Sequence, residues 1–218
     1  ASLENKGKKC ILVSTDKACQ PVNVYGSSKF IAERIFTNYD FHSTDTIFAS
    51  VRYGNVIASR GSFIPLWMEM MKENKTIKVT SKEMTRFLFT LSDAVDTVLG
   101  ALENAEGGEV FVPQINSYTI MTVVEACKEL SKVESIDYEV IGLRPGEKLH
   151  EDMLAKTELP YTFEVEGINL LCVRPQYTHR TYLNDWEKYT GPEFNSELHV
   201  SEDVGDLVTL VKRGLNDC

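Results

Sequence analysis

The stretch CILVSTDKACQPVNVYGSSK, residues 10–29, decides the fold of this chain. Its first four residues are apolar and stand before a polar run, which is typical of a buried strand. Pro21 lies within the polar run and indicates a loop, because proline interrupts regular structure. From about Val24 to Tyr39, apolar residues recur at helical spacing, so a helix follows. Strand, loop and helix in this order indicate an α/β fold.

Two side chains at the start of this helix point to acid–base chemistry. Tyr25 and Lys29 are four residues apart and therefore share one helical face. The lysine ammonium favours the phenolate form of the tyrosine, which could then take a proton from a sugar hydroxyl. Taken alone, the pair is more typical of a solvated helix face. It gains weight because a strand ending in Ser-Thr-Asp-Lys precedes it.

Composition and charge narrow the class of protein. With 218 residues and 43% hydrophobic content, the chain is long enough for a sizeable globular domain. The net charge of -9 argues against a nucleic-acid or anionic-membrane partner. No apolar run reaches the roughly 18 residues that a membrane span requires. The five cysteines are scattered without C-x-x-C spacing, so we expect a reduced cytoplasmic protein without a structural metal.

Further strands and helices are predicted along the chain. Apolar runs predict strands at residues 46–51, 76–79, 109–112, 138–141 and 168–173. A helix is predicted from Ser92, and four apolar residues are expected to form its buried stripe: Val95, Val98, Leu99 and Leu102. Thr122 and Glu125 form a capping box for the next helix, and Ser201 is the expected cap of the last one.

Five motifs occur in order along the chain and carry a resemblance to a known family. They are STDKACQPVNVYGSSK at 14–29, RYGNV at 52–56, SRGS at 59–62, MTRF at 84–87 and RPGEKLHE at 144–151. In sequence and spacing they resemble the UDP-N-acetylglucosamine 4,6-dehydratases, a polysaccharide-biosynthesis branch of the extended short-chain dehydrogenase/reductases. The resemblance covers about residues 1–155. Residues after about 165 match no part of that pattern.

The resemblance implies the C-terminal portion of a doubly wound parallel, Rossmann-type sheet with a smaller α+β substrate-binding lobe. Residues 1–56 and 88–113 would belong to the NAD(P)-binding domain. Residues 57–87 and 114–165 would form the substrate lobe, and residues 166–218 a C-terminal extension. The sequence contains no glycine-rich phosphate-binding turn. We therefore expect an N-terminally incomplete enzyme, whose missing portion is absent or belongs to a separate chain.

The reaction that the resemblance implies oxidises sugar C4, eliminates water across C5 and C6, and reduces C6. Tyr25 would be the base at the C4 hydroxyl, with Lys29 assisting it and Thr15 hydrogen-bonded to the 4-oxygen. Lys17, neutral, would remove the C5 proton, and Asp16, protonated, would give a proton to the departing C6 hydroxyl. A simple salt bridge at a strand end is the other interpretation of the Asp-Lys pair. Burial beneath the substrate would have to favour the two neutral forms.

The same resemblance implies contacts to a cofactor and a substrate. The cofactor would be NADP or NAD, with NADP favoured, and would contact Tyr25, Lys29, Tyr53 and Asn55. The UDP-sugar would be held by five residues, three of them arginines that present a planar fork to phosphate oxygens: Asn55, Arg60, Arg86, Arg144 and Glu151. Lys148 and Glu151 are expected on a helix. A homo-oligomer is expected.

Two other functions remain open at this point. A UDP-sugar 4-epimerase would need the Tyr25 and Lys29 pair but no elimination pair, so Asp16 and Lys17 favour dehydration. A non-catalytic nucleotide-sugar-binding or assembly fragment is the other alternative, because the glycine-rich turn is missing. Larger membrane-bound relatives have Met at the position of Tyr25. Its presence indicates the small soluble type, which in the family inverts C5.

Overall fold

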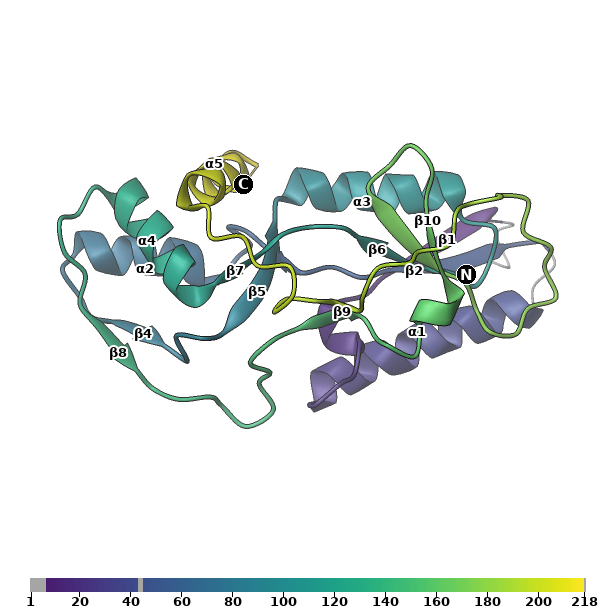
Figure 1. Ribbon diagram of the computed structural model, residues 1–218, viewed down its shortest axis with the longest axis horizontal. Helices are drawn as coiled ribbons and strands as arrows, with labels where there is room; N and C mark the ends of the chain where they lie inside the picture. The colour runs from purple at the N-terminus through teal and green to yellow at the C-terminus, as the bar shows by residue number, and fades with distance from the viewer. Residues whose placement is uncertain (1–6, 43–44, 218) are drawn as a thin grey trace. The chain divides into compact units, whose positions relative to one another are not determined.

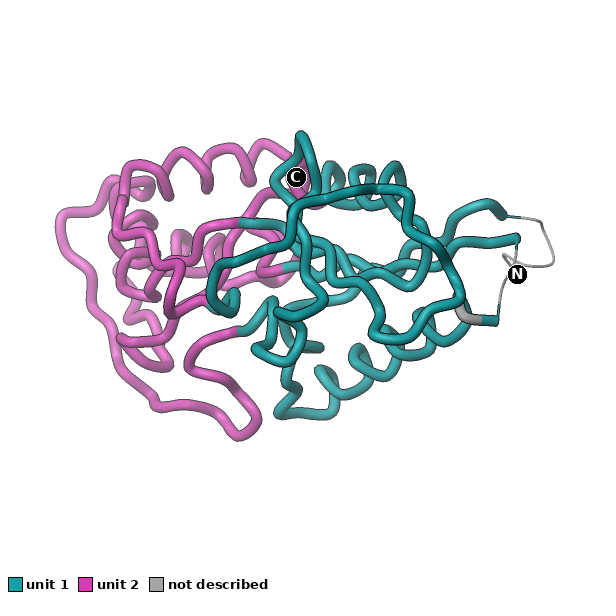
Figure 2. The backbone as a smooth tube through the Cα atoms, turned by 45° about the vertical axis from the view of Figure 1, so that its right-hand side comes forward, with its two compact units in different colours: residues 1–53, 95–114, 152–195 teal, residues 54–94, 115–151, 196–218 magenta. Residues whose placement is uncertain are grey.

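The computed structural model describes residues 7–42 and 45–217, which form two compact units. Unit 1 comprises residues 1–53, 95–114 and 152–195, and unit 2 comprises residues 54–94, 115–151 and 196–218 (Figure 2). The segment 166–218, predicted as an extension, is therefore divided between the units. The predicted assignment of cofactor-binding and substrate-binding roles to parts of the chain stays a prediction.

Unit 1 is built on a five-stranded mixed sheet with the order β1-β2-β6-β11-β10 (Figure 1). Its strands are β1 (Lys9–Val13), β2 (Ile47–Val51), β6 (Val110–Pro113), β11 (Leu170–Val173) and β10 (Thr162–Glu164). The first three run parallel, whereas β11 is antiparallel to β6 and to β10. This confirms the strands predicted near residues 10, 46, 109 and 168. The parallel strands bring their carboxyl ends to one edge of the sheet.

Two helices flank this sheet, and Figure 1 shows them on opposite faces. Helix α1 (Val24–His42) connects β1 to β2, and helix α3 (Leu91–Asn104) precedes β6. On the α1 side, the rings of Phe36 and Phe48 meet edge to face with centroids 5.6 Å apart. Strands β9 (Asp152–Leu154) and β12 (Phe194–Asn195) pair with each other in antiparallel fashion and complete the unit.

The buried stripe predicted for α3 is wrong in part. Val95 and Leu99 are each 49% exposed, and Leu102 is also exposed, whereas Val98 packs against the core. Two alanines, Ala101 and Ala105, lie fully in the core with Val51 and Phe111 of the sheet. Short side chains let a helix approach a sheet closely, so the face with less apolar area is the one that is buried.

Unit 2 is a smaller α+β assembly with its own core. Its strands form a three-stranded sheet in the order β3-β5-β7 and a separate parallel pair, β4 with β8. The strands are β3 (Asn55–Val56), β5 (Thr85–Phe89), β7 (Ser117–Thr119), β4 (Ile77–Val79) and β8 (Tyr138–Val140). Helices α2 (Phe63–Lys72), α4 (Ile120–Ser131) and α5 (Val204–Asn216) contribute Trp67, Val123 and Leu207 to one buried cluster.

The helix starts of unit 2 differ from those predicted by capping patterns. Thr119 caps α4, accepting a hydrogen bond from the Thr122 backbone N–H at 3.0 Å, so Thr122 is inside the helix. Asp203 caps α5 in the same way through the Asp206 N–H, and Ser201 lies before the cap. In both cases a second hydroxyl or carboxylate nearby had better geometry than the predicted one.

The helix predicted to contain Lys148 and Glu151 is absent, since residues 143–151 are irregular. The backbone carbonyls of Lys148 and Leu149 accept hydrogen bonds from the buried Arg86 guanidinium at 2.9 and 3.1 Å. A carbonyl that accepts from Arg86 does not need the backbone N–H four residues later in the chain, so hydrogen bonds to the Arg86 side chain take the place of those within a helix.

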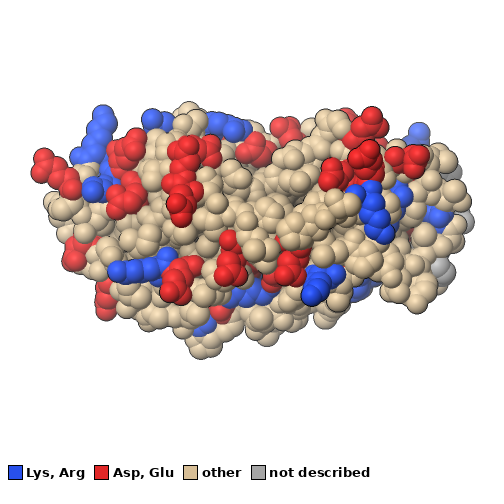
Figure 3. Space-filling model, in the orientation of Figure 1, with Lys and Arg blue, Asp and Glu red and all other residues tan. Residues whose placement is uncertain are grey.

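Charge and length give two further observations. On the face shown in Figure 3, acidic and basic side chains are interspersed, without a continuous basic surface. Within residues 7–42 and 45–217, no helix is both long and apolar enough to span a bilayer.

Candidate active site

The predicted elimination pair lies where β1 ends, in the short 3-10 helix η1 (Asp16–Ala18). The backbone N–H of Ser14 donates to the Val51 carbonyl, and that of Asp16 donates to the Tyr53 carbonyl, both at 2.7 Å. These bonds continue the pairing of β1 with β2 beyond the strands themselves. The loop that carries the candidate catalytic residues is therefore held in register with the sheet edge.

Asp16 is completely buried, and one of its two carboxylate oxygens has close partners. Its Oδ1 atom accepts hydrogen bonds from the Thr15 hydroxyl at 2.8 Å and from the Lys17 ammonium at 3.0 Å. Its Oδ2 atom is buried and has no hydrogen-bond partner among the described residues. An unpaired buried oxygen is costly, and a catalytic role is one of the reasons for which a protein keeps such an atom. The structure thus brings Thr15, Asp16 and Lys17 together.

Helix α1 begins directly against this loop. Asn23 Oδ1 accepts a hydrogen bond from the Gly26 backbone N–H at 2.8 Å and so caps the first turn. A Cβ atom at Gly26 would overlap the backbone oxygen of Lys17, so only glycine permits this approach. Lys29 Nζ donates to the Val13 carbonyl at the end of β1 at 3.3 Å. Tyr25, in the first turn, is 54% exposed.

A separate cavity of about 350 Å³ in unit 2 contains two of the predicted substrate-binding residues, Asn55 and Arg60. Asn55 and Ser62 line it, and their Oδ1 and Oγ atoms are buried and have no hydrogen-bond partner within the part of the chain that the structure describes. Arg60 is exposed. The Arg60 guanidinium, which also lines the cavity, can pair with an anionic group of a ligand.

The other predicted substrate residues lie in or beside the irregular segment 143–151. Arg86 is 6% exposed and donates to the backbone carbonyls of Thr85, Lys148 and Leu149. Its Nε atom is 3.9 Å from a Glu151 carboxylate oxygen. Arg144 is exposed in the turn closed by the Glu147 N–H, which donates to the Arg144 carbonyl at 3.0 Å. Arg86 therefore shapes the segment that presents Arg144.

The sequence did not reveal a buried cluster of charged side chains centred on Arg52, which joins Glu33 of α1 to Glu158. Arg52 is 1% exposed, and its guanidinium donates to both carboxylate oxygens of Glu33, at 3.1 and 2.8 Å. It also donates to both oxygens of Glu158, each at 2.8 Å. Ser14 Oγ donates to Glu33 Oε1 at 2.6 Å. The only sequence signal was that Glu33 follows Lys29 by four residues and that Arg52 begins the RYGNV motif.

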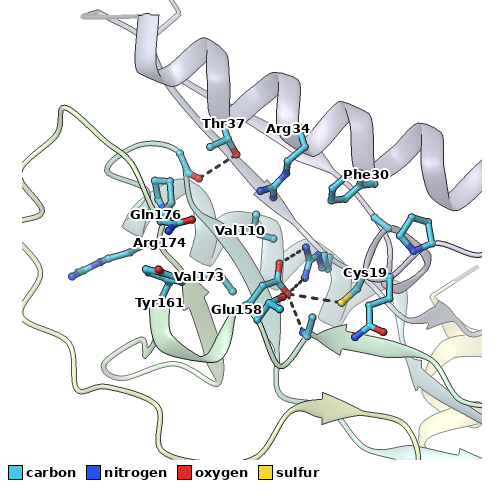
Figure 4. A pocket seen from close by; sticks show the side chains of 18 residues that line it. Cys19, Phe30, Arg34, Thr37, Val110, Glu158, Tyr161, Val173, Arg174 and Gln176 are labelled. Atoms are coloured by element: carbon cyan, nitrogen blue, oxygen red, sulfur yellow. Dashed lines mark hydrogen bonds and ion pairs between the residues drawn. The ribbon is translucent and has the colours of Figure 1, made fainter.

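Arg52 and Glu158 each favour the charged form of the other, as the directions of their pKa shifts indicate. Burial alone would lower the pKa of Arg52, but Glu158 and Glu33 raise it well above its ordinary value. Burial alone would raise the pKa of Glu158, but Arg52 lowers it below its ordinary value. Glu158 and Cys19 line a cavity of about 440 Å³ together with Phe30, Arg34 and other side chains (Figure 4).

Comparison with known proteins places these residues in a family. The model of the family described as polysaccharide biosynthesis protein matches residues 1–172. The chain belongs to this polysaccharide biosynthesis family. Over 170 residues it is 40% identical to the UDP-N-acetylglucosamine 4,6-dehydratase (inverting) of Campylobacter jejuni, covering 77% of this chain and 49% of that protein. Over 169 residues it is 37% identical to a UDP-glucose 4-epimerase of Rickettsia felis, with the same shares covered.

Solved structures similar to this family member support the fold. Pen from Bacillus thuringiensis superposes with a TM-score of 0.84 at 32% identity, covering 97% of this chain and 64% of that one. A dTDP-glucose 4,6-dehydratase from Bacillus anthracis, solved with NAD, gives a TM-score of 0.59 at 20% identity, covering 84% and 61%. The α/β fold is thus that of nucleotide-sugar epimerases and dehydratases. The chain spans about half the length of the curated relatives compared above.

Proposed function

We propose that the protein containing this chain is a nucleotide-sugar 4,6-dehydratase acting on UDP-N-acetylglucosamine. It would oxidise C4, eliminate water across C5 and C6, reduce C6 and invert C5. The observation that carries the proposal is the contact between Asp16 and Lys17, with the second Asp16 oxygen buried and unpaired. The 40% identity to a dehydratase of this specificity supports the same reaction.

A nicotinamide cofactor, NADP or NAD, would supply the hydride acceptor and donor when bound. The donor set at the end of β1 fits one end of such a group, because the Lys29 ammonium and the half-exposed Tyr25 hydroxyl are both hydrogen-bond donors there. Tyr53 and Asn55 are further proposed contacts. The preference for NADP rests on the sequence resemblance alone. The Bacillus anthracis neighbour was solved with NAD.

Five side chains would divide the work of proton transfer between them. Tyr25 takes the proton of the C4 hydroxyl, with Lys29 stabilising the phenolate. Thr15 turns its hydroxyl from Asp16 to the 4-oxygen. Lys17 then removes the C5 proton, and the Asp16 carboxyl gives a proton to the departing C6 hydroxyl, which leaves as water.

Elimination requires Asp16 to carry a proton and Lys17 to be neutral, and their contact provides a route. In the 3.0 Å contact, a proton can pass from the Lys17 ammonium to the Asp16 carboxylate. Substrate that covers Lys17 would remove it from water, and burial penalises the two charged forms more than the two neutral ones. Asp16 is already fully buried, so only Lys17, 31% exposed at its side chain, remains to be covered.

The remaining predicted residues are proposed as substrate contacts. Asn55 and Arg60 would bind from their cavity, and Arg144 would pair with a diphosphate oxygen. Arg86 would have to exchange a backbone carbonyl for phosphate, and Glu151 would add a weaker polar contact. We further propose that unit 1 corresponds to part of a Rossmann-type cofactor domain and unit 2 to the substrate lobe. That the enzyme is a homo-oligomer and is cytoplasmic stays a prediction.

Epimerisation of a UDP-sugar is the second candidate, favoured by the 37% identity to an epimerase. An epimerase has no use for a buried acid next to a lysine at the strand end, because only the C4–H bond and the O–H bond of the 4-hydroxyl are broken. The Asp16–Lys17 contact therefore favours dehydration.

Lys17→Ala in the full-length protein tests the proposal. With UDP-N-acetylglucosamine as substrate, the variant should give no product that has lost one water, while a 4-keto sugar still forms and can be trapped by borodeuteride. Lys78→Ala, at an exposed lysine of β4, is the matched control and should keep full dehydration. Normal dehydration by the Lys17 variant would remove this residue from the mechanism.

A further inference from the structure

We infer that the buried cluster of Ser14, Glu33, Arg52 and Glu158 is a positioning device that sets α1 against the end of β1 for catalysis. The inference rests on the proposed function for its kinetic test. None of the four side chains is among the residues proposed above as catalytic or as substrate contacts. Ser14, Glu33 and Arg52, however, belong to backbone segments that carry or adjoin a catalytic residue, and Glu158 holds Arg52 in place.

The connections are short and come from four segments of unit 1. Ser14 is the residue before Thr15, and its hydroxyl donates to Glu33 on α1 at 2.6 Å. Arg52 is at the end of β2, next to Tyr53, whose carbonyl accepts from the Asp16 N–H. Glu158 is held by the Ala155 N–H at 3.0 Å, and Arg52 Nη1 donates to the Met153 carbonyl at 2.9 Å.

The position of Glu33 along α1 allows the cluster to set the positions of Tyr25 and Lys29. Tyr25, Lys29 and Glu33 follow one another at four-residue steps, so they lie along one side of the helix. Glu33 is 0% exposed and accepts from both Ser14 and Arg52, which determines the rotation and axial position of the helix at that turn. A rigid helix transmits that position to the two residues one and two turns earlier.

The cluster differs from an ordinary stabilising ion pair in where it acts. A second buried carboxylate on the same helix, Asp40, is 2% exposed and accepts hydrogen bonds from the Arg180 guanidinium at 2.6 and 2.8 Å. It also accepts from the Phe48 N–H at 3.0 Å. Asp40 is about four turns beyond Tyr25, so its removal loosens the far end of α1. The two sites therefore form a matched pair: similar burial and bonding, different distance from Tyr25.

The test compares Glu33→Gln with Asp40→Asn in the full-length protein. Both changes remove one buried charge without changing the shape of the side chain. At equal folded fraction, Glu33→Gln should lower kcat about 100-fold, because a displacement on the order of 1 Å at a reacting group has that effect. The KM for UDP-N-acetylglucosamine should change less than about threefold, since the proposed substrate contacts are elsewhere. Asp40→Asn should keep kcat within about threefold.

Two readouts separate positioning from loss of folded protein. With substrate deuterated at C4, Glu33→Gln should show a larger isotope effect on kcat than wild type, because C4 oxidation becomes slower; a reduced folded fraction leaves the isotope effect unchanged. Hydrogen exchange should rise about tenfold or more at residues 26–32 in Glu33→Gln. In Asp40→Asn the increase should be confined to the last turns of α1.

The outcomes are decisive in both directions. Equal kcat and equal isotope effects for the two variants would overturn the inference while leaving the proposed function intact. If the wild-type protein does not dehydrate the sugar, the proposed function fails, and the exchange pattern still decides whether Glu33 sets the start of α1. If Glu33→Gln does not fold, Ser14→Ala replaces it; this variant loses only the 2.6 Å bond, and unchanged kcat and exchange would then contradict the inference.

Discussion

Gly26→Ala is the change by which the close approach of α1 to the catalytic loop is best measured. Alanine is favoured over glycine in a helix by about 1 kcal/mol. Against this, its Cβ would overlap the Lys17 backbone oxygen, which cannot rotate away as a side chain can. Overpacking of this kind costs about 1–3 kcal/mol. With the upper value, we expect a net loss of about 2 kcal/mol in the free energy of unfolding.

The same substitution should affect catalysis more than stability. To relieve the overlap, the first turn of α1 has to move by on the order of 1 Å, and Tyr25 moves with it, so kcat should fall about 100-fold. Gly100→Ala in α3 is the control, because its Cβ would meet only the terminal methyl groups of Ile168 and Leu170, at 3.2 Å. The control should be neutral or more stable, with wild-type kcat.

Urea denaturation followed by circular dichroism, together with steady-state rates, provides the assay. A Gly26→Ala variant with wild-type stability and rate would show that α1 does not need this contact. The account of how the helix is placed would then be refuted.

Two further predictions concern buried groups. The pKa of Glu158 is lowered in the folded protein, so its ion pair contributes stability above the ordinary glutamate value of 4.5, and this contribution is lost as the pH falls through the lowered pKa. Thermal denaturation scans from pH 7 to pH 3 should show this loss as a fall in melting temperature. Glu158→Gln should make the melting temperature depend less on pH in the acid range, and an unchanged dependence would contradict the pairing. Burial raises the pKa of Cys127 to about 12 and that of Cys172 well above the ordinary thiol value. Iodoacetamide at pH 8 should therefore label neither thiol before unfolding, and rapid labelling of Cys127 in the native protein, read by peptide mass spectrometry, would count against its burial.

Much of the fold was predictable because it follows from local patterns. Apolar runs located the strands near residues 10, 46, 109 and 168, and helical spacing located α1. The inward face of α3 was not predictable in this way, because the buried Ala101 is less hydrophobic than the exposed Val95 and Leu99. Which face is buried depends on how closely the helix can approach the sheet, and that is a property of the assembled unit.

In the candidate site, too, contacts between sequence neighbours were predictable, whereas contacts between residues far apart in the sequence were not. Contacts between neighbours in sequence, such as that between Asp16 and Lys17, follow from the motif itself, and the structure shows them; the roles of these residues stay predictions. The bonds of Arg52 to Glu33 and Glu158 join residues 19 and 106 positions apart, which no local pattern reports. Arg86 was predicted only as a phosphate ligand, and its bonds to the carbonyls of segment 143–151 depend on the fold of unit 2.

The central proposal is that the protein containing this chain eliminates water from a UDP-sugar through Asp16 and Lys17. Incubation of the full-length protein with UDP-N-acetylglucosamine in D2O, followed by mass spectrometry and NMR, tests it directly. We predict a product that has lost one water and carries deuterium at C5, because Lys17 exchanges the C5 proton with solvent. A product of unchanged mass with inverted C4 would contradict the claim and identify the protein as an epimerase.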